Sequence, residues 1–205
     1  MYSRNLQHAA QVLKQGGLVA YATEYCFGLG CDPFNRDAVL RLLRIKRRPV
    51  NKGLIVLAAD LSQLAPFVTE IPNPVLASWP GPHTWLLPAG PDVPRWITGA
   101  HTRIAVRITA HPQAAALCRA AGMAIVSTSA NIAGTAPARS DREVRRRFGA
   151  HIDCILGGRV GQARAPDADP RRRQRGPDPA LTGKWKDGGD WPTIVRWATI
   201  SGLGS

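Results

Sequence analysis

Residues 18–30 read Leu-Val-Ala-Tyr-Ala-Thr-Glu-Tyr-Cys-Phe-Gly-Leu-Gly, and this stretch decides the fold. Its first five residues are an apolar run of the length of a buried strand. Before it, apolar residues recur at helical spacing from Leu6 to Leu13, and Gly16-Gly17 ends that helix. The remainder, Thr23 to Gly30, is polar and rich in glycine and predicts a turn at the strand's end, where ligands of open α/β sheets tend to bind.

The same alternation of elements continues along the chain. Short runs rich in apolar and β-branched residues predict strands at 54–57, 83–87, 104–108, 123–127 and 152–156. Helices are predicted from Asn35, after Asp60, over 112–121, and from Ser140 to Phe148, where Ser140 and Glu143 form a capping box. Because strands and helices do not alternate strictly, we expect the α/β class with an open, twisted, mixed sheet and flanking helices.

Composition limits the protein class. The chain has 205 residues, of which 44% are apolar, as expected of one globular domain. Its 27 Lys and Arg against 14 Asp and Glu give a net charge of +13, which indicates a polyanionic partner or an anionic substrate. Apolar runs such as 54–59 are far shorter than the ~18 residues of a membrane span, so no membrane partner is expected. The first apolar run is interrupted at 14–17, so no signal peptide is predicted.

The four cysteines indicate the cellular compartment. They are Cys26, Cys31, Cys118 and Cys154. No two form a CxxC pair, and none has the spacing to histidine that zinc sites show. We therefore expect small buried thiols in a cytoplasmic protein, with no metal bound by these residues.

The character of the sequence changes after Gly158. Residues 159–179 hold six arginines, four prolines and no large apolar residue beyond Val160, so they cannot form a packed element. We predict a core domain over 1–158, a basic arm rich in Arg and Pro over 159–183, and a divergent C-terminal tail over 184–205. The tail is apolar enough to dock back onto the core.

The strongest local signal is the run Lys46-Arg47-Arg48-Pro49-Val50-Asn51-Lys52-Gly53, which ends a helix and begins a strand. Cations at a helix C-terminus can simply complement the helix dipole. Four cations within seven residues, fixed by Pro and Gly, are more typical of a phosphate clamp, in which Arg gives bidentate contacts and Lys a point charge.

Two other features could carry chemistry. Ser127-Thr128-Ser129-Ala130-Asn131 follows an apolar strand, and its side chains could either bind a phosphate or carboxylate or cap the next helix. Arg107 lies within the strand 104–108 and points either to solvent or into a cleft, where it could hold a carboxylate. No nucleophile–base pair is visible, so we predict no covalent catalytic residue and expect catalysis by positioning and charge stabilisation.

Five ordered motifs resemble the YrdC/TsaC family of threonylcarbamoyl-AMP synthases. They are the turn 22–33, the run 46–54, Trp79-Pro80-Gly81-Pro82-His83-Thr84, the strand 104–108 with His111-Pro112, and residues 127–134. The resemblance implies a YrdC-like catalytic domain with a basic cavity. There ATP, L-threonine and bicarbonate would give threonylcarbamoyl-AMP and pyrophosphate, for the modification of adenosine 37 in tRNA.

The resemblance also implies roles for single residues. ATP would be bound by Lys46, Arg48, Lys52, Ser129 and Asn131. Threonine would be bound by Thr23, Tyr25, Arg107 and Ser127. ATP is a substrate, and Mg²⁺ would neutralise the pyrophosphate as a threonine-derived carbamate attacks the α-phosphorus.

The sequence departs from the family pattern at three places. Tyr25 stands where relatives often have a small residue or Thr, and Arg103 where Ser or Thr is common. The arm replaces a stretch that precedes the Thr-Gly pair of short relatives, recognisable here only in Ala180-Leu181-Thr182-Gly183.

An alternative without catalysis remains open. The net charge and the six arginines of the arm are also typical of a module that binds double-stranded RNA or tRNA. Under either reading, tRNA or tRNA-modification proteins are the expected macromolecular partners.

Overall fold

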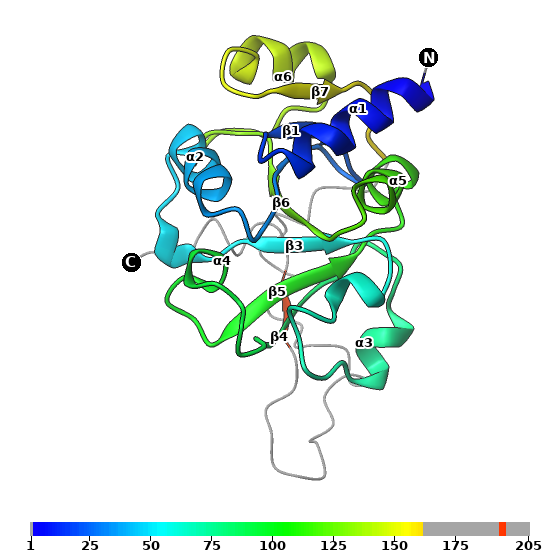
Figure 1. Ribbon diagram of the computed structural model, residues 1–205, viewed down its shortest axis with the longest axis vertical. Coiled ribbons are helices and arrows are strands. Elements are labelled where there is room, and N and C mark those ends of the chain that lie inside the picture. The colour runs from blue at the N-terminus through cyan, green and yellow to red at the C-terminus, as the bar shows by residue number, and fades with distance from the viewer. Residues whose placement is uncertain (1, 162–192, 196–205) are drawn as a thin grey trace, which may run out of the picture.

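The core is a single mixed β-sheet with helices on both faces (Figure 1). A computed structural model describes residues 2–161 and 193–195. The strands are β1 Val19–Ala22, β2 Phe27–Gly30, β3 Ile55–Ala58, β4 Thr84–Pro88, β5 Arg103–Ile108, β6 Ile125–Ser129, β7 Cys154–Leu156 and β8 Thr193–Val195. Their order across the sheet is β7-β1-β2-β6-β3-β5-β4-β8. β1 pairs parallel with β7, and β3 with β5, while the other pairs are antiparallel. The expected open mixed α/β sheet is confirmed.

Helices form the outer layers. They are α1 Tyr2–Lys14, α2 Arg36–Lys46, α3 Asn73–Ala77, α4 Arg95–Thr98, α5 Pro112–Ala121 and α6 Asp141–Phe148, with 3-10 turns η1 Val50–Lys52 and η2 Ser62–Leu64. Figure 1 shows α1 and α5 on one side of the sheet and α2 and α4 on the other. Alternate strand residues feed two apolar clusters, so Tyr21 and Leu57 pack with α1 and α5, while Ala20 and Val56 pack with α2, α4 and α6. None of the described helices is long and apolar enough to cross a membrane.

The stretch 18–30 forms a hairpin rather than a strand followed by a long turn. Only residues 23–26 make the turn, and the expected turn at Phe27–Gly30 is wrong because those residues are β2. Glycine is required there by close packing. A Cβ on Gly30 would lie 2.6 Å from the carbonyl oxygen of Val126 and 2.9 Å from the Tyr21 ring. The glycines therefore allow β2 to lie close to β1 and β6.

The predicted helix caps are confirmed. The Asn35 side chain accepts from the backbone N–H of Ala38 and starts α2, and Ser140 accepts from the N–H of Glu143 and starts α6. The Glu143 carboxylate accepts from the N–H of Arg139, one residue before the cap. At its other end, α2 closes through Arg47, whose φ of 51° lies in the left-handed region. This reversal directs the chain into the loop that carries Arg48 and Lys52.

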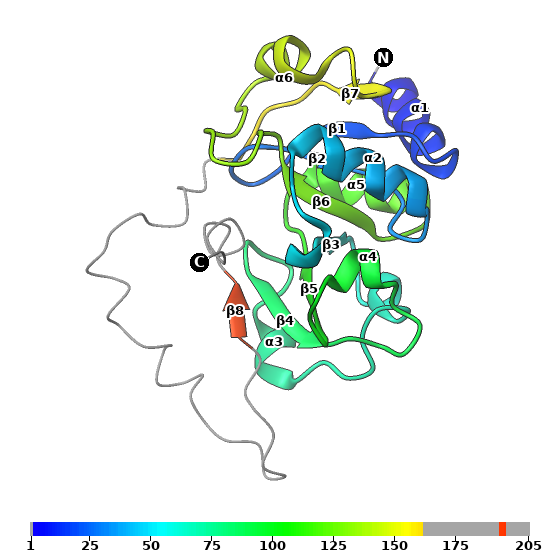
Figure 2. The same ribbon diagram turned by 90° about the vertical axis from the view of Figure 1, so that its left-hand side faces the viewer.

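Residues 157–161 run back along the first hairpin. The Gly161 N–H donates to the Thr23 carbonyl at 2.9 Å, and the Gln113 amide donates to the Gly157 carbonyl at 2.8 Å. The rest of the predicted arm, residues 162–183, lies outside the described residues. Of the predicted tail, β8 is described, and its backbone pairs with β4 at the sheet edge (Figure 2).

The four cysteines are free thiols. Cys26, Cys31 and Cys118 are buried and Cys154 is half-buried. Burial raises the pKa of the Cys26 thiol to about 11, which keeps it protonated and unreactive at neutral pH.

Candidate functional site

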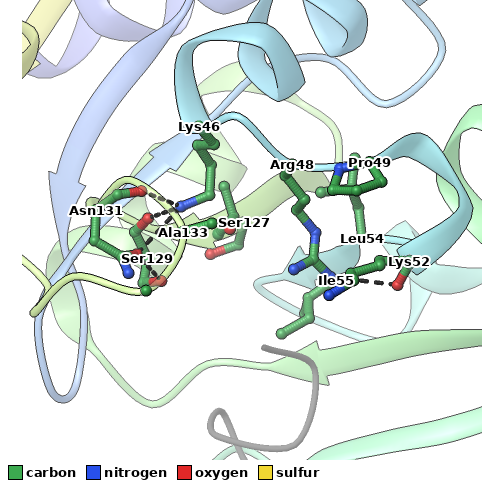
Figure 3. Close-up of a pocket in the computed structure, with 12 residues that line it drawn as sticks. Lys46, Arg48, Pro49, Lys52, Leu54, Ile55, Ser127, Ser129, Asn131 and Ala133 are labelled. Carbon is green, nitrogen blue, oxygen red and sulfur yellow. Dashed lines mark hydrogen bonds between the residues drawn. The ribbon is translucent and has the colours of Figure 1, made fainter. Parts of the chain in front are cut away.

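A pocket lies between the loop that joins α2 to β3 and the loop that follows β6 (Figure 3). Its polar lining is Lys46, Arg48, Lys52, Ser127, Thr128, Ser129 and Asn131, and its other lining residues are Pro49, Leu54, Ile55, Ala133 and Gly134. The fold thus brings together two segments, 46–55 and 127–134, that lie about 80 residues apart in sequence. All five residues that were expected to bind ATP line this one pocket.

Lys46 joins the two sides of the pocket. Its side chain is only 4% exposed, and its Nζ donates to the Ser129 carbonyl, the Asn131 carbonyl at 2.8 Å and the Asn131 Oδ1 at 3.2 Å. Burial, with a smaller contribution from the nearby Arg48, lowers the pKa of Lys46 to about 7. The ammonium therefore holds the 129–131 loop in place as well as facing the pocket.

Arg48 and Lys52 form the other cationic wall (Figure 3). The Arg48 guanidinium donates to the Gly53 carbonyl at 3.0 Å and to the Lys52 carbonyl at 3.3 Å, which fixes the turn between η1 and β3. Partial burial lowers the pKa of Arg48, although a guanidinium stays charged at neutral pH. Lys52 is half-buried and lines the pocket.

The serine-rich segment lies partly within a strand. Residues Ser127–Ser129 belong to β6, so the expectation that they follow the strand is wrong. The Ser129 hydroxyl donates to the Asn131 Oδ1 at 2.5 Å, and the Asn131 amide donates to the Thr135 carbonyl at 2.7 Å. These side chains do not cap the following helix, because Ser140 caps α6. Their structural role is to shape the loop that forms one wall of the pocket.

Arg107 points into the protein and not to solvent. Its side chain is 1% exposed, its Nε donates to the Thr84 hydroxyl at 2.9 Å, and its Nη1 lies 3.3 Å from a carboxylate oxygen of Glu24. Burial lowers the pKa of Arg107, and Glu24 opposes that shift. Strand register places Arg107 opposite Leu57, on the sheet face that also carries Ile55 and Ser127, two residues that line the pocket.

The other residues expected to bind threonine occupy the first hairpin and β6. The Thr23 hydroxyl donates to the Cys26 carbonyl at 2.7 Å and closes the turn. The Tyr25 ring lies under the Arg139 guanidinium, 4.9 Å from ring centroid to Cζ. Of the four, only Ser127 lines the pocket, while Thr23, Tyr25 and Arg107 are not among its lining residues.

Sequence reasoning missed four polar residues that form one cluster with Arg107. They are Tyr21, Glu24, Thr84 and Thr109. Glu24 and Thr84 lie within two of the family motifs, and this position was the only signal in the sequence that could have indicated a role for them. Tyr21 was counted as apolar core. Its hydroxyl is buried, and burial raises its pKa.

The described lining of the pocket suits an anion. Its described residues include no Asp or Glu, and no group of three or more His, Cys, Asp and Glu side chains anywhere in the described chain is placed to hold a metal. Cations, hydroxyls and an amide can instead bind phosphate oxygens.

Comparisons with known proteins identify the family of the chain. The family model for Sua5, YciO and YrdC, described as telomere recombination, matches residues 11–168. A threonylcarbamoyl-AMP synthase of Halorhodospira halophila is 54% identical over 165 residues, which is 78% of this chain and 86% of that protein. One of Xanthomonas campestris pv. campestris is 51% identical over 171 residues, with 80% and 91% covered.

Solved structures share the fold. The P. abyssi Sua5 complexed with L-threonine is 36% identical with a TM-score of 0.72 over 77% of this chain, which spans 47% of that protein, about half its length. E. coli YciO is 28% identical with a TM-score of 0.68, and the match covers 77% of this chain and 80% of YciO.

Proposed function

The chain belongs to the Sua5, YciO and YrdC family, and from this we infer that it is a threonylcarbamoyl-AMP synthase, an enzyme of the nucleotidyltransferase type. The observation that supports this function most directly is the pocket that joins the Lys46–Lys52 run to Ser127–Asn131. ATP is the substrate for which this pocket is suited, because the described residues of its lining combine cations with polar groups and include no carboxylate.

The reaction we propose joins three substrates. The amino group of L-threonine combines with bicarbonate, forming an N–C bond and releasing water, to give a carbamate. A carbamate oxygen then attacks the α-phosphorus of ATP, the new O–P bond forms, and the bond from Pα to the β-phosphate oxygen breaks. The products are threonylcarbamoyl-AMP and pyrophosphate. In such a step the protein acts by alignment and by stabilising developing negative charge.

On the nucleotide side, we propose that Lys46, Arg48 and Lys52 bind the phosphates. Among the described residues, Lys52 shows no hydrogen bond from its ammonium, so it can make a direct phosphate contact without breaking an internal one. Lys46 acts in part through the loop that it holds, because three of its contacts are to Ser129 and Asn131. These two residues add polar contacts to the nucleotide.

On the amino-acid side, we propose that Arg107 holds the carboxylate of threonine, with Ser127, Thr23 and Tyr25 nearby. The Ser127 hydroxyl is buried, and its only neighbouring partner among the described residues is the Tyr21 hydroxyl, so it can donate to a substrate. Because Ser127 lines the phosphate pocket and shares a sheet face with Arg107, it connects the two halves of the site.

Mg²⁺ enters this scheme only as part of the nucleotide substrate. Among the residues that the structure describes, the pocket lining has no carboxylate to hold the ion, so the phosphates themselves would be its ligands. The threonylcarbamoyl-AMP product is a reactive mixed anhydride, and we propose that tRNA-modification proteins acting on tRNA in the cytoplasm consume it.

Pyrophosphate release tests the proposed function. The purified chain is incubated with ATP, bicarbonate and L-threonine, and pyrophosphate is measured with each substrate omitted in turn. We expect release that depends on all three, with threonylcarbamoyl-AMP detected by mass spectrometry. Release without threonine, or no release in the complete mixture, would contradict the proposal and favour the RNA-binding alternative.

A further inference from the structure

Glu24 faces Arg107 inside the protein and has no role in the scheme above. Its side chain is 13% exposed, against 1% for Arg107. The Thr109 hydroxyl donates to Glu24 Oε1 at 2.5 Å, and Arg107 Nη1 approaches Oε2 at 3.3 Å. A charged pair this deeply placed is costly to desolvate, so it calls for an explanation other than stability.

The chain fixes both members of this pair from several directions. The Thr109 hydroxyl that binds Glu24 also accepts from the N–H of His111 at 3.1 Å, which orients it. Arg107 is fixed by its bond to the Thr84 hydroxyl. The carboxylate and the guanidinium are thus held side by side by strands β4 and β5 and the residues that follow β5, although Glu24 itself comes from the first hairpin.

Two buried hydroxyls beside the pair have no partner other than each other among the described residues. The Tyr21 and Ser127 hydroxyls are neighbours and both are buried, and apart from each other neither has a hydrogen-bond partner within the described residues. Leaving a buried polar group unsatisfied costs roughly 1–3 kcal/mol, so such groups are usually kept for a ligand. Ser127 also lines the phosphate pocket, so a ligand at this cluster would adjoin the nucleotide.

We propose that Glu24 and Arg107 form a two-ended receptor for a zwitterion, in which Arg107 takes the carboxylate of the amino acid and Glu24 takes its ammonium group. This inference rests on the proposed function, since it assumes that the amino acid binds at Arg107. It assigns Glu24 as a specificity-determining residue. It also places the substrate nitrogen in the same buried cluster as Tyr21, whose hydroxyl neighbours Ser127 of the phosphate pocket.

Charge balance is the physical basis of the selectivity. An isolated buried guanidinium would accept any carboxylate or phosphate, whereas a neutral Arg–Glu pair disfavours a ligand with net negative charge. A zwitterion adds no net charge to the pair. It replaces the contact between Arg107 and Glu24 with two contacts, one from Arg107 to its carboxylate and one from Glu24 to its ammonium group. The opposite role for Glu24 would be to occupy Arg107 in the empty protein and compete with the substrate carboxylate. The two roles predict effects of opposite sign when the charge of Glu24 is removed.

The decisive experiment compares two ligands. Calorimetry measures the affinity of the full chain for L-threonine and for 2,3-dihydroxybutanoate, which has a hydroxyl in place of the ammonium group. In Glu24→Gln we expect threonine affinity to fall by about 10- to 100-fold, since a charge-assisted hydrogen bond is lost, while affinity for the hydroxy acid is unchanged or higher. The exposed Glu70→Gln is the matched control and should behave as wild type. Glu24→Gln that binds threonine as well as or better than wild type would overturn the proposal.

A second variant covers the case in which Glu24→Gln does not fold. Thr109→Val removes the hydroxyl that orients the carboxylate but keeps both charges, and Thr109→Ser keeps the hydroxyl. We expect Thr109→Val to lose preference for threonine over the hydroxy acid by about 3- to 10-fold and Thr109→Ser to retain it. An unchanged preference in Thr109→Val would overturn the proposal.

Failure of this inference can be told apart from failure of the proposed function. Wild type that releases pyrophosphate with threonine, together with unchanged ligand preference in the variants, rejects the role of Glu24 alone. Wild type that binds threonine with the expected preference but forms no pyrophosphate rejects the synthase activity and retains the receptor.

Discussion

The two sides of the site hold their cations by different partners. On the proposed nucleotide side, Lys46 and Arg48 donate to backbone and amide oxygens, and the described lining of the pocket contains no carboxylate. On the proposed amino-acid side, Arg107 is buried against the carboxylate of Glu24. Neutral oxygens leave the positive charge of Lys46 available for a polyanion, whereas the carboxylate of Glu24 balances Arg107, as suits the neutral zwitterion that we propose to bind there. The ligands that we propose for the two sides therefore differ with the partner of each cation.

The largest effect is expected on the amino-acid side. Arg107→Ala removes the guanidinium that we propose to bind the threonine carboxylate. It also leaves Glu24 as a buried charge without its cation, which costs about 3–5 kcal/mol of stability. We expect threonine-dependent pyrophosphate release to fall by about 100- to 1,000-fold, and thermal denaturation to show a lower Tm. The exposed Arg119→Ala serves as control. An unchanged KM for threonine in Arg107→Ala would remove the distinction between the two sides.

A smaller and more selective effect is expected at Lys52. Lys52→Ala removes a cation from the phosphate pocket without breaking a described internal bond. The kcat/KM for ATP should fall by about 10- to 100-fold, while the KM for threonine and the Tm stay close to wild type. Steady-state kinetics with each substrate varied separately would check this. A rise in the KM for threonine alone would place Lys52 on the other side of the site.

Lys46 should make stability depend on pH. Because burial lowers its pKa to about 7, the unfolded chain binds more protons than the folded chain from about pH 7 up to the ordinary lysine range. The contribution of Lys46 to stability therefore rises with pH across that window and is lost as the pH falls toward 7. In urea denaturation at pH 7, 8 and 9, the unfolding free energy of wild type should rise relative to that of Lys46→Met by at most about 1.4 kcal/mol per pH unit. A difference in unfolding free energy between wild type and Lys46→Met that stays the same at all three pH values would contradict this.

The smallest effect is expected at an ion pair outside the site. Arg41 donates to both carboxylate oxygens of Asp153, at 2.7 and 3.0 Å, yet the two side chains are 40% and 38% exposed. Arg41→Ala should cost less than about 1 kcal/mol and leave pyrophosphate release unchanged, because solvent screens the pair. The same chemistry is thus compared at the surface and in the interior. A loss of stability in Arg41→Ala as large as that in Arg107→Ala would mean that burial does not determine the energetic cost of breaking the ion pair.

Sequence reasoning predicted most elements and one half of the site. Helix periodicity and the caps at Asn35 and Ser140 are local signals, and so is the Lys46–Lys52 run, because its cations are adjacent in the chain. The strand β2 was missed because Gly28 and Gly30 indicate a turn unless the packing of Tyr21 is known.

The part that could not be predicted depends on distant contacts. Glu24 and Arg107 are 83 residues apart, and only the folded sheet brings the hairpin turn to the end of β5. The contacts of Lys46 with Ser129 and Asn131 span a similar separation. Sequence pattern and propensity are local properties. They can mark single residues as candidates, but they cannot show which distant residues are in contact.

The bond between the Gly161 N–H and the Thr23 carbonyl bears on how this protein can be shortened or fused to others. A Cβ on Gly161 would come within 2.6 Å of the Glu24 carbonyl oxygen, so only glycine lets the chain lie this close to the hairpin. A chain cut after Gly158 would lose the bond and expose the turn that carries Glu24. A boundary placed after Gly161 keeps that turn covered, and a fused domain would then begin beside the amino-acid side of the site.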